Sequence, residues 1–157
     1  MKALNSFIKP LSGALVLLAC VVPAQAAWET VDFVSNTQDE DHAFLDIAAA
    51  PDGNIYAADL VSHPIGLPST TLLRRSADLG NSWQNVAEFV GSMPYLAANE
   101  PGRVYLAGTI DRKWTVLRSE SQGVSWSELD SYALPDGRPN DIAVDPTGTI
   151  WVVGLGG

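Results

Sequence analysis

Two copies of an eight-residue turn pattern constrain the fold of this 157-residue chain more than any other feature. The first copy, Ser76–Trp83, has the pattern Ser-x-Asp-x-Gly-x-Ser-Trp, and a degraded copy follows at Ser119–Trp126. In such a turn the Asp side chain accepts backbone hydrogen bonds, and the Gly supplies a positive φ. Ser121 replaces the Asp in the second copy, so we expect that turn to be held more weakly.

A second repeated unit predicts β-hairpins. Its copies are Asp46–Ala58, Tyr95–Ala107 and Asp141–Val153, and each is a short apolar strand, a polar turn and a second apolar strand. In each copy a Gly lies seven residues after the first position, and an aromatic residue follows that Gly by three. These glycines are 49 and 46 residues apart, and the tryptophans of the turn motif are 43 apart. A period of this length predicts four-stranded units of an all-β repeat protein.

The turn motif resembles the Asp-box, or BNR repeat, of sialidase-like and sortilin-like β-propellers. The resemblance rests on Ser76, Asp78, Gly80 and Trp83 in the first copy and on Ser119, Gly123 and Trp126 in the second. It implies a β-propeller built of four-stranded antiparallel blades. The motif is structural in that family, so these seven residues are expected to shape turns and to carry no chemistry.

The repeat also predicts how the blades are distributed along residues 27–157. We expect a lone outer strand at 28–33, complete blades at 44–90 and 93–133, and the inner hairpin of a third blade at 139–154. About two and a half blades are therefore expected, whereas a closed propeller takes at least four. Either the sequence is truncated, or several chains self-associate into one ring. Truncation is favoured, because the sequence stops inside a blade.

Residues 1–26 have the plan of a bacterial secretory signal peptide. Two lysines precede a short apolar run, and an Ala-Gln-Ala sequence ends at Ala26. This pattern predicts cleavage after Ala26 and a secreted or periplasmic protein. The alternative is a lipobox at Leu17–Cys20, which would lipidate Cys20 and anchor the chain to a membrane.

The charge and the cysteine usage narrow the classes of partner. The formal net charge is −9, and loss of the two lysines with the signal peptide would make it −11. An acidic exported protein is a poor candidate for binding nucleic acid or an anionic membrane. Cys20 is the only cysteine, so the cleaved chain would have neither a disulfide nor a cysteine-ligated metal.

The resemblance places ligand sites on the propeller face opposite the Asp-boxes. Asp46, Tyr95 and Asp141 hold equivalent positions at the start of the inner strands, near the mouth of the channel. Such groups can bind a sugar or a cation, or act as acid and nucleophile; alternatively, they cap loop backbone or bind channel water. Three further residues on this face are candidate ligand-binding residues, Asp111, Arg112 and Arg138, and the basic ones could meet a carboxylate ligand. The loops of this face are expected at 36–43, 59–69, 91–94, 109–113 and 135–140.

Catalytic and metal-binding residues remain unassigned. The sialidase family carries an arginine triad and an early Arg-Ile-Pro motif, and this sequence has no Arg-Ile-Pro. His42 and His63 lack the spacing of a metal site, and the acidic run 39–41 lacks the alternating ligands of a calcium loop.

Three functions are compatible with these patterns. The favoured one is an exported, non-enzymatic propeller that binds a protein or a glycan or has a structural role. The alternative is a piece of a secreted, sialidase-like glycoside hydrolase whose catalytic residues lie mostly outside this chain. A third is a lactonase-like propeller with a channel-bound calcium, which Asp46 and Asp141 fit and the Asp-boxes do not. No other cofactor is expected.

Overall fold

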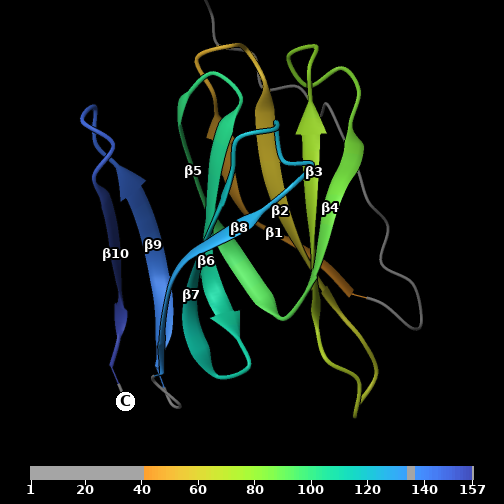
Figure 1. Cartoon of the computed structure of the whole chain (residues 1–157). Coiled ribbons are helices and arrows are strands. Elements are labelled where there is room, and N and C mark those ends of the chain that lie inside the picture. The colour runs from red at the N-terminus through yellow and green to blue at the C-terminus, as the bar shows by residue number, and fades with distance from the viewer. Residues whose placement is uncertain (1–40, 134–136, 157) are drawn as a thin grey trace, which may run out of the picture.

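The computed structural model describes residues 41–133 and 137–156. This part of the chain consists of ten β-strands and their turns, without a helix (Figure 1). The predicted all-β class is confirmed, and so are the four-stranded antiparallel sheets. The predicted signal peptide and the lone outer strand at 28–33 lie outside the described residues.

Two sheets of the same topology follow one another along the chain, each with its strands in sequence order. The first consists of β1 (Asp41–Ala49), β2 (Ile55–Ser62), β3 (Thr70–Ser76) and β4 (Gln84–Val90). The second consists of β5 (Ser92–Glu100), β6 (Arg103–Ile110), β7 (Lys113–Ser119) and β8 (Ser127–Ala133). A two-stranded sheet of β9 (Arg138–Val144) and β10 (Ile150–Leu155) completes the described chain.

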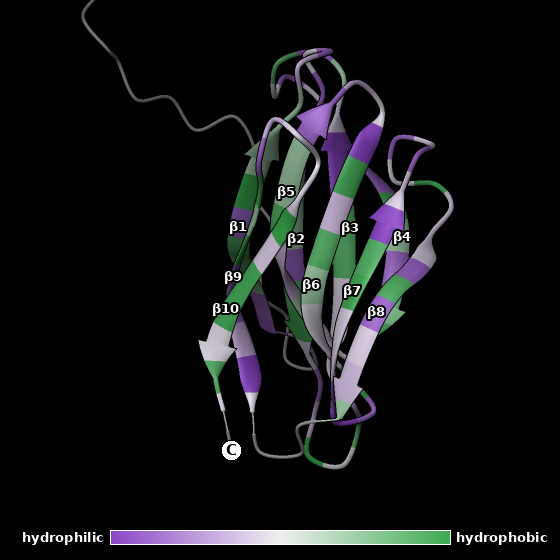
Figure 2. Ribbon diagram, turned by 60° about the vertical axis from the view of Figure 1, so that its left-hand side comes forward, coloured by the Kyte–Doolittle hydropathy of each residue, from purple (hydrophilic) through white to green (hydrophobic). Residues whose placement is uncertain are grey.

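The three sheets stack in chain order, with β1 and β2 against β5, and β5 and β6 against β9. Two apolar clusters fill the two junctions. The first joins Tyr56 and Leu73 of the first sheet to Leu96 and Leu106 of the second. The second joins Tyr105 and Ala107 of β6 to Ile142 of β9. Figure 2 shows the apolar residues of β6 and β10. Successive β6 side chains point to opposite faces, so this strand contributes to both clusters.

Asp78 holds the turn between β3 and β4. Its Oδ1 accepts hydrogen bonds from Ser76 Oγ at 2.8 Å and from the Ser82 N–H at 2.9 Å, and its Oδ2 accepts one from Ser82 Oγ at 2.6 Å. The bonds from Ser82 and Ser76 hold the pKa of Asp78 below its usual value. Gly80, with φ of 92°, donates its N–H to Ser76 Oγ at 2.8 Å. Trp83 Nε1 then donates to the Gly80 carbonyl at 3.1 Å.

The turn between β7 and β8 repeats this arrangement around a neutral side chain. Ser121 Oγ accepts the Ser125 N–H at 2.8 Å and lies 2.7 Å from Ser125 Oγ. Gly123 donates its N–H to Ser119 Oγ at 3.0 Å, and Trp126 Nε1 donates to the Gly123 carbonyl at 2.8 Å. A hydroxyl has one uncharged oxygen where a carboxylate has two charged ones. The geometry is therefore kept with fewer and weaker acceptors.

The strands extend into each loop that the sequence pattern predicted. β2 continues to Ser62, β5 already begins at Ser92, and β9 begins at Arg138. Pro94 obscured the start of β5, because proline within a run of residues argues against a strand. The structure accommodates it at an irregularity, since the register of β5 against β6 shifts between Ser92 and Tyr95.

Candidate functional site

A surface cavity of about 360 Å³ lies where β5 and β9 begin and β6 ends. Its size falls within the range of ligand pockets in proteins. Two of the residues predicted to bind a ligand, Tyr95 and Arg138, are in its lining. The described residues of the lining are Leu45, Ser92, Pro94, Tyr95, Gly108, Thr109, Arg138, Pro139 and Asn140.

The chemistry of this cavity is that of a binding site for a polar ligand. Arg138 supplies a planar guanidinium, which pairs with carboxylates through two parallel hydrogen bonds. Tyr95 supplies an aromatic ring and a hydroxyl, and Asn140 supplies an amide that both donates and accepts. Among the described residues, the lining contains no Asp or Glu. These groups can pair with an acidic or hydroxyl-rich molecule, and the described part of the lining provides no carboxylate for acid–base chemistry.

Asp46 joins the first sheet to the second. Its Oδ1 accepts the N–H of Ile47 at 2.8 Å, and its Oδ2 accepts the N–H of Leu96 in β5 at 2.7 Å. Both carboxylate oxygens thus bind backbone groups, one of them fifty residues away along the chain. Among the roles that the sequence allowed for Asp46, these two bonds correspond to the capping of backbone groups.

Asp141 was predicted beside Asp46 and Tyr95 at one channel mouth. Like Asp46, it accepts a hydrogen bond from the N–H of the residue that follows it. Its Oδ1 accepts the N–H of Ile142 at 2.8 Å. Neither Asp46 nor Asp141 lines the cavity that contains Tyr95. The structure therefore does not bring the two carboxylates and the phenol into one cavity.

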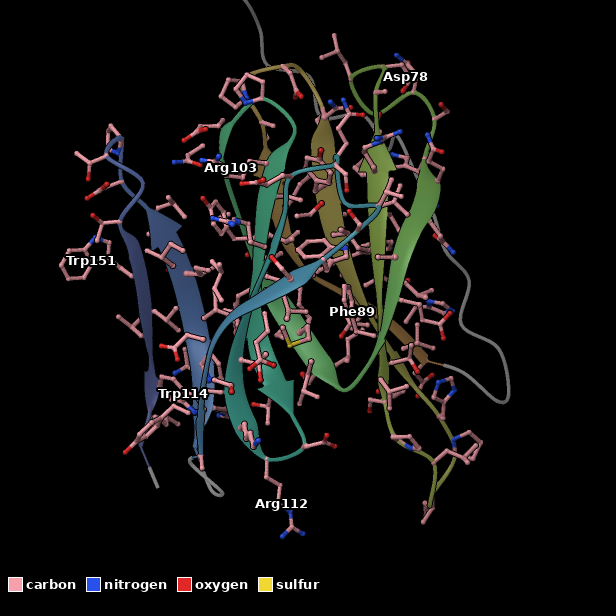
Figure 3. The ribbon with its side chains drawn as sticks, viewed as in Figure 1. Asp78, Phe89, Arg103, Arg112, Trp114 and Trp151 are labelled. Carbon is pink, nitrogen blue, oxygen red and sulfur yellow. The ribbon has the colours of Figure 1, made fainter. Side chains whose placement is uncertain are left out.

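Asp111 and Arg112 form the two-residue turn between β6 and β7, with φ of 49° and 59°. Both are exposed, and neither lines the Tyr95 cavity. Figure 3 shows Arg112 at the end of the molecule opposite Asp78. Of the three added polar residues, only Arg138 reaches the cavity.

A histidine–aspartate pair in the first sheet was missed by the sequence reasoning. His42 Nδ1 lies 2.8 Å from Oδ2 of the buried Asp59. The two residues are 17 positions apart, but the β1–β2 register pairs His42 with Val61 and Phe44 with Asp59, so they are diagonal neighbours on one face. The predicted hairpin around Gly53 was the one feature of the sequence from which this pairing of strands could have been inferred. His42 lines a second cavity of about 260 Å³ together with His63 and Glu88.

Within 41–133 and 137–156, no group of three or more His, Cys, Asp or Glu side chains is placed to hold a metal ion. The same residues contain no helix long and apolar enough to cross a membrane. The sequence matches no protein-family model and shows no significant similarity to a curated protein.

Proposed function

We propose that this chain is an exported segment of an Asp-box β-propeller, and that the Tyr95 cavity binds a glycan or an acidic group of a protein without catalysis. Export is inferred from the signal-like residues 1–26, and N-terminal sequencing of the purified protein should then begin at Ala27. A first residue at Cys20 would instead indicate a lipoprotein.

The propeller architecture is supported by the way the sheets repeat. Both four-stranded sheets are meanders, and each places its Asp-box turn between its third and fourth strands. Stacking in chain order with apolar clusters in the junctions is the arrangement expected of neighbouring blades. The matching bonds around Gly80 and Gly123 support a common origin for the two turns.

A binding role is favoured by the position of the carboxylates. Most glycoside hydrolases place a pair of carboxylates across the scissile bond. Here the described lining of the cavity includes Tyr95, Arg138 and Asn140 and no acid, while both oxygens of Asp46 bind backbone N–H groups. One observation carries the proposal. The described lining of the cavity has groups that can bind a ligand and no acid, whereas the Asp46 carboxylate joins two sheets.

The test is calorimetric titration of the purified protein with matched oligosaccharides that contain or lack a carboxylate. Arg138→Gln should weaken binding of the acidic oligosaccharide by about tenfold or more, because a charge-assisted pair is lost, and should spare the neutral one. Tyr95→Ala should weaken both. Arg112→Gln is the control, since it removes an exposed arginine outside the cavity. Equal affinities in wild type and Arg138→Gln, or cleavage of either oligosaccharide, would contradict the proposal.

A further inference from the structure

The first strand of each sheet contains a β-bulge at the same position of the hairpin repeat. The register of β1 against β2 shifts between Phe44 and Asp46, which leaves Leu45 without a partner in β2. Pro94 in β5 and Asn140 in β9 are skipped in the same way by the registers of their sheets. Each of these three residues directly precedes the first position of the repeat. The bulge is therefore a property of the repeat.

Glycines make room for two of the three bulges. Gly108 in β6 and Gly154 in β10 each directly follow the last position of the repeat. A Cβ on Gly108 would collide with the backbone of Met93, and one on Gly154 would collide with that of Pro139. Asp59 holds this position in the first sheet. In the second and third sheets, the close approach of the bulged strand thus depends on a glycine across from it.

All three bulge residues, Leu45, Pro94 and Asn140, line the Tyr95 cavity. In a regular strand, successive side chains point to opposite faces of the sheet, whereas a bulge changes the direction of a side chain and is common beside binding sites. Here the consecutive residues Pro94 and Tyr95 both line the cavity, and so do Pro139 and Asn140. Each sheet thus contributes its bulge residue to one shared cavity.

The chemistry of the bulge residues favours a sugar acid over an acidic side chain of a protein. An ionised carboxylate only accepts hydrogen bonds, whereas sugar hydroxyls both donate and accept, as the Asn140 amide does. Arg138, two residues before Asn140, can hold a carboxylate. Leu45 and Pro94 add apolar surface for the C–H groups of a sugar ring.

We propose that the bulge position determines the ligand specificity of the cavity, and that its ligand is a sugar acid. Asn140 binds ring hydroxyls beside the carboxylate held by Arg138, and Leu45 contacts the apolar side of the ring. This inference rests on the proposed binding function and narrows its ligand class. It also assigns specificity to residues that precede the repeat positions of Asp46 and Asp141 by one.

The experiment is an NMR titration of the isotope-labelled protein, in which amide shifts report both affinity and location. The probes are the methyl glycosides of galacturonic acid, glucuronic acid and galactose, and a glutamate capped as N-acetyl methylamide. Wild type should bind at least one of the two uronides more tightly than galactoside or capped glutamate, with shifts at Leu45 and Asn140.

Asn140→Leu should weaken uronide binding by about tenfold or more, because the hydrogen bonds of the amide are lost, and should leave binding of the capped glutamate unchanged. Leu45→Ala should weaken the uronides and the galactoside by about fivefold, because apolar contact is lost. Asn85→Leu is the matched control, since Asn85 is exposed and lies outside this cavity. The amide spectrum of each variant shows whether it keeps the fold.

Uronide binding that is equal in Asn140→Leu, Leu45→Ala and wild type would overturn the role of the bulge position. A capped glutamate that binds more tightly than both uronides, or two uronides that do not bind, would overturn the sugar-acid class. In the first of these cases the proposed function still stands if Arg138→Gln abolishes glutamate binding. That function fails only if no probe shifts the amides around Tyr95 and Arg138.

Discussion

At the scale of single residues, the β3–β4 and β7–β8 turns show what the aspartate of the repeated turn motif contributes. Asp78 uses both oxygens to accept bonds from its neighbours, and these bonds lower its pKa. Asp145, in the β9–β10 turn, also has a lowered pKa, because Thr147 and Thr149 donate to it. Ser121 keeps the turn without a charge. The chain therefore contains turns held by a carboxylate, at Asp78 and Asp145, and a turn held by a neutral hydroxyl, at Ser121.

The lowered pKa of Asp78 predicts a dependence of stability on acid. A carboxyl whose folded pKa is below its usual 3.8 contributes stability that is present above pH 3.8 and is lost as pH falls through the folded pKa. Asp78→Asn should therefore reduce the steepness of the acid decline in unfolding free energy between pH 4 and pH 2. Urea unfolding across this range measures it. Ser121→Asn is the matched control in the neutral turn, and an acid decline equally steep in Asp78→Asn and wild type would contradict the account.

The position of a candidate site residue could be predicted where the sequence repeat aligns it with equivalent residues in other copies. Equivalence to Asp46 and Asp141 placed Tyr95 at the start of an inner strand, and the structure places it in a cavity there. The bond from the Leu96 N–H to Asp46 was not predictable, because it joins two sheets and leaves no local pattern. The His42–Asp59 pair lies within the first sheet and was missed because it depends on the register of β1 against β2, which local composition does not contain.

At the scale of strands and turns, the sequence predicted the turns more accurately than the strand ends. The hairpin glycines Gly53, Gly102 and Gly148 all have positive φ, of 86°, 73° and 86°, and only glycine adopts such angles at little cost. The strand ends are set by pairing partners in neighbouring strands, which local composition does not contain. β5 illustrates this, since it begins two residues before a proline.

Gly108 in β6 is needed for close packing rather than for its backbone angle. A Cβ at this position would collide with the Ser92 carbonyl oxygen and with Met93, which is fully buried. Gly108→Ala should lower the free energy of unfolding by about 1–3 kcal/mol, the usual cost of overpacking. Gly156→Ala is the control, because nothing lies within 4 Å of its Cβ position. Equal urea midpoints for Gly108→Ala and wild type would show that the β5–β6 junction is looser than described.

At the scale of the molecule, polar bonds between sheets supplement the apolar clusters. Asp52 Oδ2, in the first hairpin turn, accepts the N–H of Gly102 in the second at 2.9 Å. Arg75 reaches from the first sheet to Gln122 Oε1 at 2.7 Å, and Phe89 meets Trp126 edge to face, with ring centroids 5.4 Å apart. The first junction is thus fixed at its turns as well as through its core.

One of the carboxylates predicted at the channel mouth takes part in this junction. Asp46 lies within the same junction and bonds across it, so its carboxylate stabilises the stacking of the sheets. The described lining of the cavity with Tyr95 and Arg138 includes neither Asp46 nor another acid. Asp46 therefore joins two sheets and does not line this cavity.

Amide hydrogen exchange at Leu96 tests this claim most directly. The Leu96 N–H donates to Asp46 Oδ2 at 2.7 Å, so its protection depends on that carboxylate. In Asp46→Ala the Leu96 amide should exchange about tenfold faster or more, the loss expected from a hydrogen bond to a charged group, while the amides of β7 keep their protection. If Leu96 is equally protected in Asp46→Ala and wild type, Asp46 does not join the two sheets, and it returns to the set of candidate ligand-binding residues.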